Sequence, residues 1–110
     1  MIADVYRIEN SRGEGPYKGR PDDWQEEPHN SDTGRPGPYN DGISLYGDSW
    51  ERFAFLSMAQ LKKWFTKNEI RALADSGYII RRFRKVRILS WSVNQCTFDY
   101  NTRGAVTYDI

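Results

Sequence analysis

The stretch FAFLSMAQLKKWFTKNEIRALADSG, residues 53–77, holds a short apolar run followed by two helix signals. Residues 53–56 are all apolar and predict a buried strand. Ser57 precedes Gln60 by three residues, and Thr66 precedes Glu69 by three, which is the capping-box pattern at a helix N-terminus. The apolar residues that follow predict a helix over 58–65 and a second helix that Gly77 closes. Their apolar stripes are Met58, Leu61, Trp64 and Phe65 in the first, and Ile70, Leu73 and Ala74 in the second.

Strand signals lie on both sides of this helical stretch. Residues 2–8 alternate between two faces, and residues 78–93 continue in runs of β-forming residues. Residues 95–100 and 105–110 flank a turn at 101–104, in which Gly104 would supply a positive φ, so they predict a hairpin. Helices grouped between strands predict an α+β fold, with a small antiparallel or mixed sheet, two short helices and a long N-terminal loop.

All five prolines and seven of the nine glycines lie between Gly13 and Gly47. A loop of this length is typically functional or disordered. Its five aromatic residues favour an ordered surface that packs on the rest of the chain and carries recognition. They are Tyr17, Trp24, Tyr39, Tyr46 and Trp50. We therefore predict one domain over 1–110, with a loop over about 10–50 and a helix–strand half over 52–110.

Composition excludes several classes of protein. The 110 residues have a mean hydropathy of −0.80 and a 15% aromatic content, so a few large rings must form one modest core. The single cysteine, Cys96, excludes an internal disulfide and favours a reducing compartment. No signal peptide or membrane span is recognisable, so we expect a soluble, cytoplasmic protein that has no membrane partner. The oligomeric state is left open.

Metal and nucleophile chemistry lack the residues they need. His29 is the only histidine, which argues against a structural zinc site and against a catalytic triad. We assign the acidic loop residues to partner binding and not to calcium binding, because their spacing does not match that of a calcium-binding loop. They are Asp22, Asp23, Glu26 and Glu27. Together with Tyr17, Trp24, Tyr39 and Tyr46 they form the predicted partner-binding surface.

The charge of the chain is strongly divided. Residues 1–51 hold eleven acidic and five basic residues, whereas residues 52–110 hold four and eleven. The two halves could attract each other or face different partners. Five cations lie within residues 81–87, namely Arg81, Arg82, Arg84, Lys85 and Arg87. On a regular strand Arg82 and Arg84 would share a face with Val86, and the others would share a face with Phe83.

Cations on both faces predict a strand at the edge of a sheet, where charge blocks aggregation. The same arginines suit phosphate, and Trp91 and Phe98 nearby could stack on bases. The net charge of only +1 is low for a nucleic-acid-binding domain. Direct nucleic-acid binding by this basic surface therefore ranks behind binding of an acidic protein.

Three segments resemble the ADP-ribosyltransferase pattern: Val5-Tyr6-Arg7, Phe55-Leu56-Ser57 and residues 94–98. The resemblance implies that Arg7 binds NAD and that Ser57 steadies it, with Thr97 at the position of the catalytic glutamate. A neutral hydroxyl cannot replace a carboxylate in stabilising a cationic ribose. Asp99 shares a strand face with Thr97 and could supply the acid instead. This departure favours a scaffold that is not an enzyme, with NAD as a cofactor only if activity is retained.

The whole chain also resembles a group of small phage proteins. The shared features are the Tyr6-Arg7 start, Gly15-Pro16-Tyr17 and the helix entry at residues 53–57. This resemblance implies a non-enzymatic accessory protein that occludes a host protein or nucleoprotein complex, for example an anti-CRISPR that inhibits bacterial immunity. The alternatives are a divergent ADP-ribosyltransferase and a nucleic-acid-binding module that uses residues 81–87.

Overall fold

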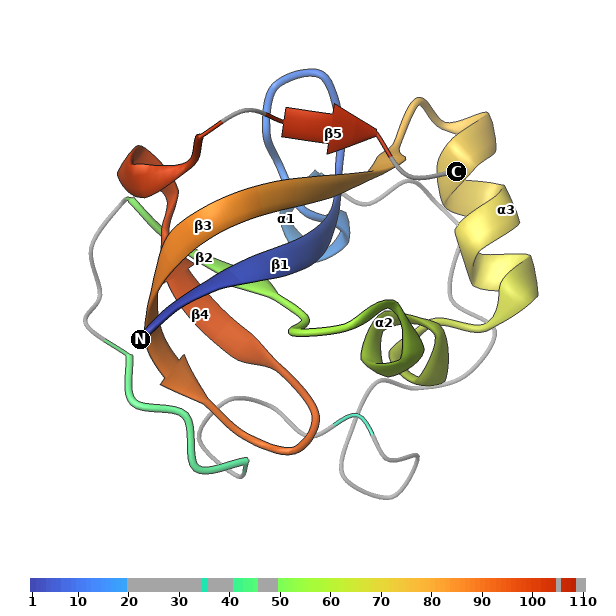
Figure 1. Cartoon of the computed structure of the whole chain (residues 1–110). Helices are drawn as coiled ribbons and strands as arrows, with labels where there is room; N and C mark the ends of the chain where they lie inside the picture. The colour runs from blue at the N-terminus through green and yellow to red at the C-terminus, as the bar shows by residue number, and fades with distance from the viewer. Residues whose placement is uncertain (20–34, 36–40, 46–49, 105, 109–110) are drawn as a thin grey trace.

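A computed structural model describes residues 1–19, 35, 41–45, 50–104 and 106–108. Its centre is a five-stranded antiparallel sheet with the order β1-β3-β4-β2, and β5 pairs with β3 (Figure 1). The strands are β1 Ile2–Glu9, β2 Glu51–Ala54, β3 Ile79–Trp91, β4 Cys96–Asp99 and β5 Val106–Tyr108. The α+β fold class predicted from the sequence is confirmed.

The sheet curls until its two ends meet. The backbones of Tyr6 in β1 and Phe55, just after β2, exchange two hydrogen bonds of 2.8 Å. β3 is long enough to reach both halves of this curl, because its first part pairs with β1 and its last part pairs with β4. The twist that drives such curling is intrinsic to β-strands, and bulges increase it.

Four short helices join the strands: α1 Pro16–Gly19, α2 Met58–Trp64, α3 Lys67–Asp75 and the 3₁₀ helix η2 Tyr100–Thr102. α3 begins with the predicted capping box of Thr66 and Glu69, and Gly77 follows its end with a φ of 89°. α2 begins at Ser57, whose hydroxyl accepts from the Gln60 amide. The Gln60 side chain reaches one residue further back and accepts from the Leu56 amide, so this cap is not a reciprocal box.

The core consists of two clusters of buried residues. One joins the helices to the sheet and contains Ile8, Phe55, Leu61, Trp64, Phe65, Leu73 and Tyr78. The other fills the curl of the sheet and contains Val5, Ala54, Phe83, Val86, Ile88, Cys96 and Phe98. Two predicted core residues are exposed, since Ala74 lies on the solvent side of α3 and Phe53 is 39% exposed.

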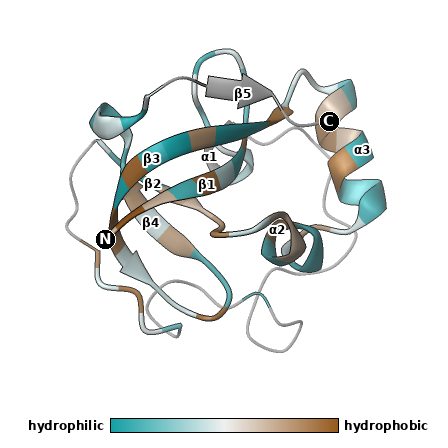
Figure 2. Ribbon diagram, viewed as in Figure 1, coloured by the Kyte–Doolittle hydropathy of each residue, from teal (hydrophilic) through white to brown (hydrophobic). Residues whose placement is uncertain are grey.

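The prediction that the basic run lies at a sheet edge is wrong. Residues 81–83 of β3 have β1 on one side and β5 on the other, and residues 88–91 pair with β4. Figure 2 shows the polar character of this central strand, with teal residues along much of its length. Arg81 and Arg82 therefore lie between two strands and do not protect a free edge.

The predicted division of β3 into two regular faces is also wrong, because a bulge interrupts it. Ala3 pairs with Val86 and Val5 pairs with Phe83, so Arg84 and Lys85 together oppose Asp4. Lys85 takes a φ of 54°, which is unusual for a residue other than glycine. As a result Phe83 and Val86 both reach full burial, although they are three residues apart.

The predicted C-terminal hairpin is not formed. β4 is followed by η2, and β5 pairs with β3 through Arg81–Tyr108, Arg82–Thr107 and Phe83–Val106. Gly104 is not among the glycines with positive φ in the described chain, which are Gly13, Gly42 and Gly77. The hairpin of this sheet is instead β3–β4, whose turn is closed by the Ser92 and Gln95 backbones.

Candidate functional site

Most exposed large apolar side chains of the described residues gather around the C-terminal half of β3. Trp91 is 53% exposed, and Val93, two residues further along, is 83% exposed. Ile2 pairs with Arg87, and the Met1 carbonyl accepts from the Ile88 amide. Leu45 follows Ser44, whose amide donates to the Ser90 hydroxyl. We call Met1, Ile2, Leu45, Trp91 and Val93 the apolar ridge.

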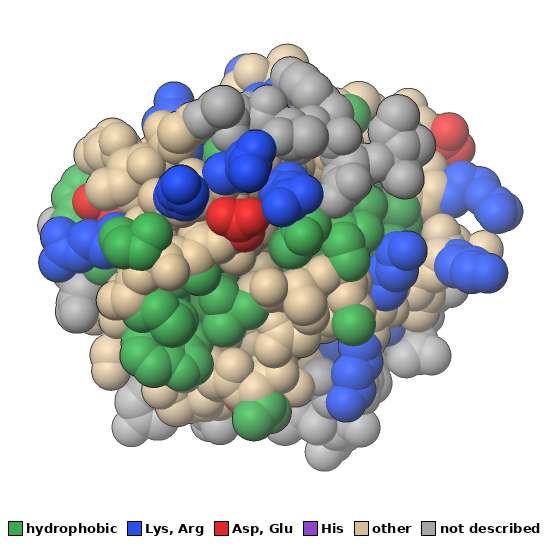
Figure 3. Space-filling view, viewed as in Figure 1, with side chains coloured by type: hydrophobic (Ala, Val, Ile, Leu, Met, Phe, Trp, Pro, Cys, Tyr) green, Lys and Arg blue, Asp and Glu red, His purple; other side chains and the backbone are tan. Residues whose placement is uncertain are grey.

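The apolar ridge lies beside basic side chains. Figure 3 shows a hydrophobic patch near the N-terminus and, next to it, lysine and arginine side chains over β3. Arg84, Lys85 and Arg87 are all exposed. Isolated apolar residues are common on protein surfaces, but a contiguous group rimmed by polar residues is typical of an interaction site.

Asp4 organises the bulge that presents these cations. Its Oδ1 accepts from the Lys85 amide at 3.0 Å, and its Oδ2 accepts from Arg82 Nη2 at 3.0 Å. The hydrogen bond from Lys85 and then the one from Arg82 lower the pKa of Asp4. The Arg82 guanidinium also lies 6.0 Å from the centre of the Tyr6 ring. Arg82 is thus tied to β1, whereas Arg84 and Lys85 point away on the bulge.

Arg81 belongs to a different, buried group of charges around Glu9. The Glu9 carboxylate accepts from Arg7 Nε at 3.0 Å and from the Tyr100 hydroxyl at 3.0 Å, and Arg81 Nε lies 3.5 Å away. Glu9 is 1% exposed and Arg7 is 6% exposed. Burial, opposed by the charge of Glu9, lowers the pKa of Arg7. Such a pair is stable in the interior because each charge has a partner.

The remaining donors of Arg7 hold the loop after β1. Nη1 donates to the Phe53 carbonyl at 2.7 Å, and Nη2 donates to the Gly13 carbonyl at 3.1 Å. A Cβ atom at Gly15 would lie only 3.3 Å from Arg7 Nη2, so this glycine allows the close approach. Arg7 is thus paired with an acidic residue of the same strand. Its predicted role in NAD binding would require these internal contacts to break.

The other three residues of the predicted catalytic set either cap a helix or are buried in the core. Ser57 caps α2, and Asp99 Oδ1 accepts from the Asn101 amide at the start of η2. Thr97 is fully buried, and among the described residues its hydroxyl has no hydrogen-bond partner. An oxygen that solvent cannot reach has no access to a dinucleotide. The ADP-ribosyltransferase resemblance therefore stays a prediction.

Of the predicted partner-binding residues only Tyr17 lies within the described chain. Its hydroxyl accepts from Trp64 Nε1 at 2.7 Å, and its ring lies 6.3 Å from that of Phe65, so it fastens α1 to α2. Burial raises the pKa of Tyr17 to about 12. The other predicted residues are outside the described part, namely Trp24, Tyr39, Tyr46, Asp22, Asp23, Glu26 and Glu27.

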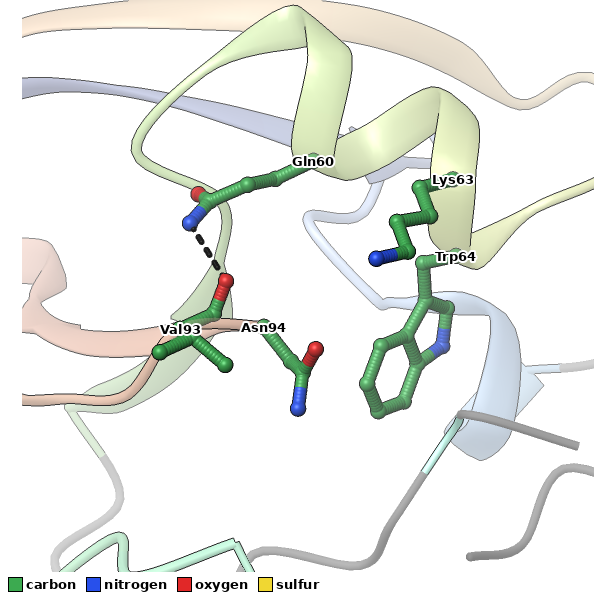
Figure 4. A pocket seen from close by; sticks show the side chains of 5 residues that line it. All are labelled: Gln60, Lys63, Trp64, Val93 and Asn94. Atoms are coloured by element: carbon green, nitrogen blue, oxygen red, sulfur yellow. Dashed lines mark hydrogen bonds between the residues drawn. The ribbon is translucent and has the colours of Figure 1, made fainter. Parts of the chain in front are cut away.

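A shallow pocket adjoins the apolar ridge at Val93. Figure 4 shows Lys63 above the Trp64 ring and Asn94 to its left, and Gln60 Nε2 donates to the Val93 carbonyl at 2.9 Å. The turn that forms one wall is rigid, because the Asp41 carboxylate accepts from Ser92, Asn94 and Gln95. Val93 is thereby held at the outer end of the ridge.

Sequence reasoning named Trp91 only as a base-stacking residue and missed the rest of the ridge. Phe98, named with it, is fully buried and cannot stack on a ligand. The signal for Trp91 was its position near the basic run at residues 81–87. No local signal could have found Ile2 or Leu45, because strand pairing and the Ser44–Ser90 contact bring them there.

The sequence model of the Bacteriophage T4 Y00F protein family matches residues 1–108. The chain belongs to this phage protein family. This confirms the part of the resemblance that pointed to small phage proteins. No curated protein and no solved structure matches the chain. The family description states no activity, so the function has to be argued from the surface.

Membrane-spanning helices and metal-ion clusters were also sought among the described residues. None of their helices is both long and apolar enough to cross a membrane. They contain no group of three or more His, Cys, Asp or Glu side chains placed to hold a metal ion. The apolar ridge and the neighbouring arginines are accordingly the features of the described chain that a function can be built on.

Proposed function

We propose that this phage protein acts by binding a host protein through the apolar ridge and thereby covering a site that the host protein needs. The observation that carries the proposal is the exposure of Trp91, Ile2 and Val93 around the C-terminal half of β3 and the turn after it. Tryptophan and arginine dominate the energetics of protein interfaces, and both are present here.

The rigidity of the ridge favours binding. Trp91 and Ile2 lie on paired strands, and Val93 lies in the turn that Asp41 fastens. Residues held in place lose little conformational freedom when a partner docks, so more of the contact energy appears as affinity. Because no chemical group of the predicted catalytic set is exposed and free of structural duties, occlusion suits this surface better than catalysis.

The basic side chains beside the ridge favour an acidic protein. Electrostatic complementarity mainly raises the association rate and the specificity of such a complex. Our expectation that the target belongs to bacterial immunity, and that the effect is anti-CRISPR-like, stays a prediction. So does direct binding of nucleic acid by residues 81–87.

Capture from bacterial lysate followed by quantitative mass spectrometry tests the proposal. The bait is the full chain in three forms: unaltered, with Trp91→Ala and Val93→Ser combined, and with Lys62→Glu and Lys67→Glu combined. We expect one host protein to be enriched by the unaltered chain and by the lysine variant, and to fall at least about tenfold with the ridge variant.

A further variant and a nuclease treatment make this test more specific. Trp91→Phe keeps an aromatic ring and should restore most of the captured protein. Nuclease treatment of the lysate should leave the capture unchanged. Equal capture by all three baits, no enriched protein, or loss of capture after nuclease treatment would each contradict binding of a host protein through the ridge. Thermal melts of the variants check that each remains folded.

A further inference from the structure

The arginines near η2 converge on one aromatic ring, that of Tyr100. This ring is fixed from inside, because it packs edge-on against Phe83 at 5.6 Å and its hydroxyl donates to the buried Glu9. The Arg103 guanidinium lies 4.1 Å from the ring centre, and the Arg52 guanidinium lies 5.1 Å from it. Both distances are within the range of cation–π interaction.

Backbone contacts hold the two arginines in place. Arg103 Nη1 donates to the Tyr100 carbonyl at 2.7 Å, and Arg52 Nη1 donates to the Glu51 carbonyl at 3.0 Å. A guanidinium carries five N–H donors in a rigid plane. Arg103 is exposed, and this bond takes up one of its five donors. A planar fork that is already oriented suits a carboxylate or phosphate, which it can bind through two oxygens.

The segment after η2 brings this pair next to the basic part of β3. The Thr102 hydroxyl accepts from the Arg87 amide at 2.9 Å. The Arg84 carbonyl lies so close to Gly104 that a Cβ atom there would be 3.4 Å from it. Residues 102–104 therefore run alongside β3 at Arg84 and Arg87. The backbones of Arg84 and Arg87 thus lie beside the segment that carries Arg103, and Arg103 shares the Tyr100 ring with Arg52.

We infer that Arg52, Arg84, Arg87 and Arg103 form an anion-binding site that receives carboxylates of an acidic partner protein. The inference rests on the proposed function and adds the chemistry of the partner. The site adjoins the apolar ridge, since Arg87 pairs with Ile2.

The surrounding acids favour protein carboxylates over a nucleic-acid backbone. Asp4 lies at the bulge that carries Arg84, and Asp99 caps η2 opposite Glu51. A phosphodiester chain carries a negative charge at every nucleotide and would meet these carboxylates along its path. Discrete carboxylates on a protein surface can contact the arginines and avoid the acids.

Fluorescence anisotropy with a labelled poly-glutamate of about twenty residues tests the site directly, at low and at moderate salt. We expect Arg52→Gln with Arg103→Gln to weaken its Kd at least about tenfold and to flatten the dependence of Kd on salt. Lys62→Gln with Lys67→Gln removes the same charge elsewhere and should change the Kd less than about twofold. Equal losses in both double variants, or no binding by the unaltered chain, would overturn the inference.

A single-stranded DNA of twenty nucleotides is the competing probe. If it binds the unaltered chain at least as tightly as poly-glutamate, and loses affinity with the same arginine variants, the site is a phosphate site and the inference is wrong. Trp91→Ala should leave poly-glutamate binding unchanged, since that probe has nothing to place on the ridge. Failure of the lysate capture with intact poly-glutamate binding would thus count against the proposed function alone.

Discussion

At the scale of single residues, the interior of this small protein accommodates ionic groups by pairing each one. Glu9 receives hydrogen bonds from Arg7 and Tyr100, and Arg81 lies beside it. Burial, together with the negative charge of Glu9, raises the pKa of Tyr100. The tyrosine hydroxyl therefore remains a donor to Glu9 at any ordinary pH, and the ring that supports Arg103 stays in place.

Removing Glu9 is expected to be costly. Glu9→Ala leaves Arg7 and Arg81 close together without their counter-charge, and breaking a buried ion pair in this way typically costs about 3–5 kcal/mol. Urea unfolding measures the change. Arg12→Ala, which removes an exposed arginine paired with Glu14, serves as the control and should cost less than about 1 kcal/mol. Similar losses in both variants would show that the buried network contributes little.

Cys96 makes the folded state sensitive to high pH. Burial raises the pKa of its thiol from 9.0 to about 12. Between these values the unfolded chain has lost a proton that the folded chain keeps, so the free energy of unfolding falls by about 1.4 kcal/mol per pH unit. The contribution is complete below pH 9 and is lost as the pH approaches 12. Tyr17 adds a smaller loss above pH 10, because the residue is 49% exposed to solvent.

Denaturant unfolding at pH 8, 9, 10 and 11 measures this loss of stability. Cys96→Ala removes one titrating group and should flatten the decline between pH 9 and 10, where Tyr17 does not yet contribute. The same burial should keep the native thiol unreactive toward a thiol reagent until the protein unfolds. Rapid labelling of the native protein at pH 8 would contradict the burial of Cys96.

At the scale of elements, the bulge in β3 decides what the strand exposes. Opposite Asp4 the strand needs two residues, and Lys85 adopts the left-handed conformation that this geometry requires. The hydrogen bond from its amide to Asp4 compensates part of the strain. The extra residue places Phe83 and Val86 in the core and leaves Arg84 outside.

A glycine should suit position 85 better than lysine does. Lys85→Gly is expected to be neutral or to stabilise the protein by up to about 1 kcal/mol, because glycine adopts positive φ without steric cost. Arg84→Gly is the matched control in the adjacent residue, whose φ is not positive, and should destabilise by about 0.5–1 kcal/mol. Thermal melts compare the two. A larger loss for Lys85→Gly than for Arg84→Gly would contradict the bulge.

At the scale of the whole molecule, the acidic and basic halves of the chain do meet. Arg35 is 4% exposed and donates to Glu69, which is fully buried at the start of α3. Asp41 and Ser44 likewise hold the end of β3 and its turn. The attraction that we weighed from the charge distribution is seen at Asp4–Arg82 and Glu9–Arg81, whereas Arg35–Glu69 has the opposite polarity.

The contact between Arg35 and Glu69 predicts that the free energy of unfolding depends strongly on Arg35, although it lies 34 residues before Glu69 in the sequence. Arg35→Met would leave the Glu69 carboxylate buried without this partner, and we expect a loss of about 3–5 kcal/mol. Combining it with Glu69→Gln, which keeps an acceptor for the Thr66 amide, should recover part of that loss. Urea unfolding of the three variants forms a double-mutant cycle. Additive effects would show that the two residues do not interact in solution.

The sequence by itself determined the local elements of this protein. Both helices, the Thr66–Glu69 box, the Gly77 stop and the first strand were predicted, because caps and helical stripes depend on residues only three or four apart. The α+β class followed from their order along the chain.

Only the tertiary structure decided which strand lies beside β3 and which residues reach the surface there. The pairing of β5 with β3, the bulge at Lys85 and the gathering of Arg52 with Arg103 depend on contacts between distant parts of the chain. Such pairings are chosen by how the whole sheet closes and buries its apolar side, and no short stretch of sequence contains that information.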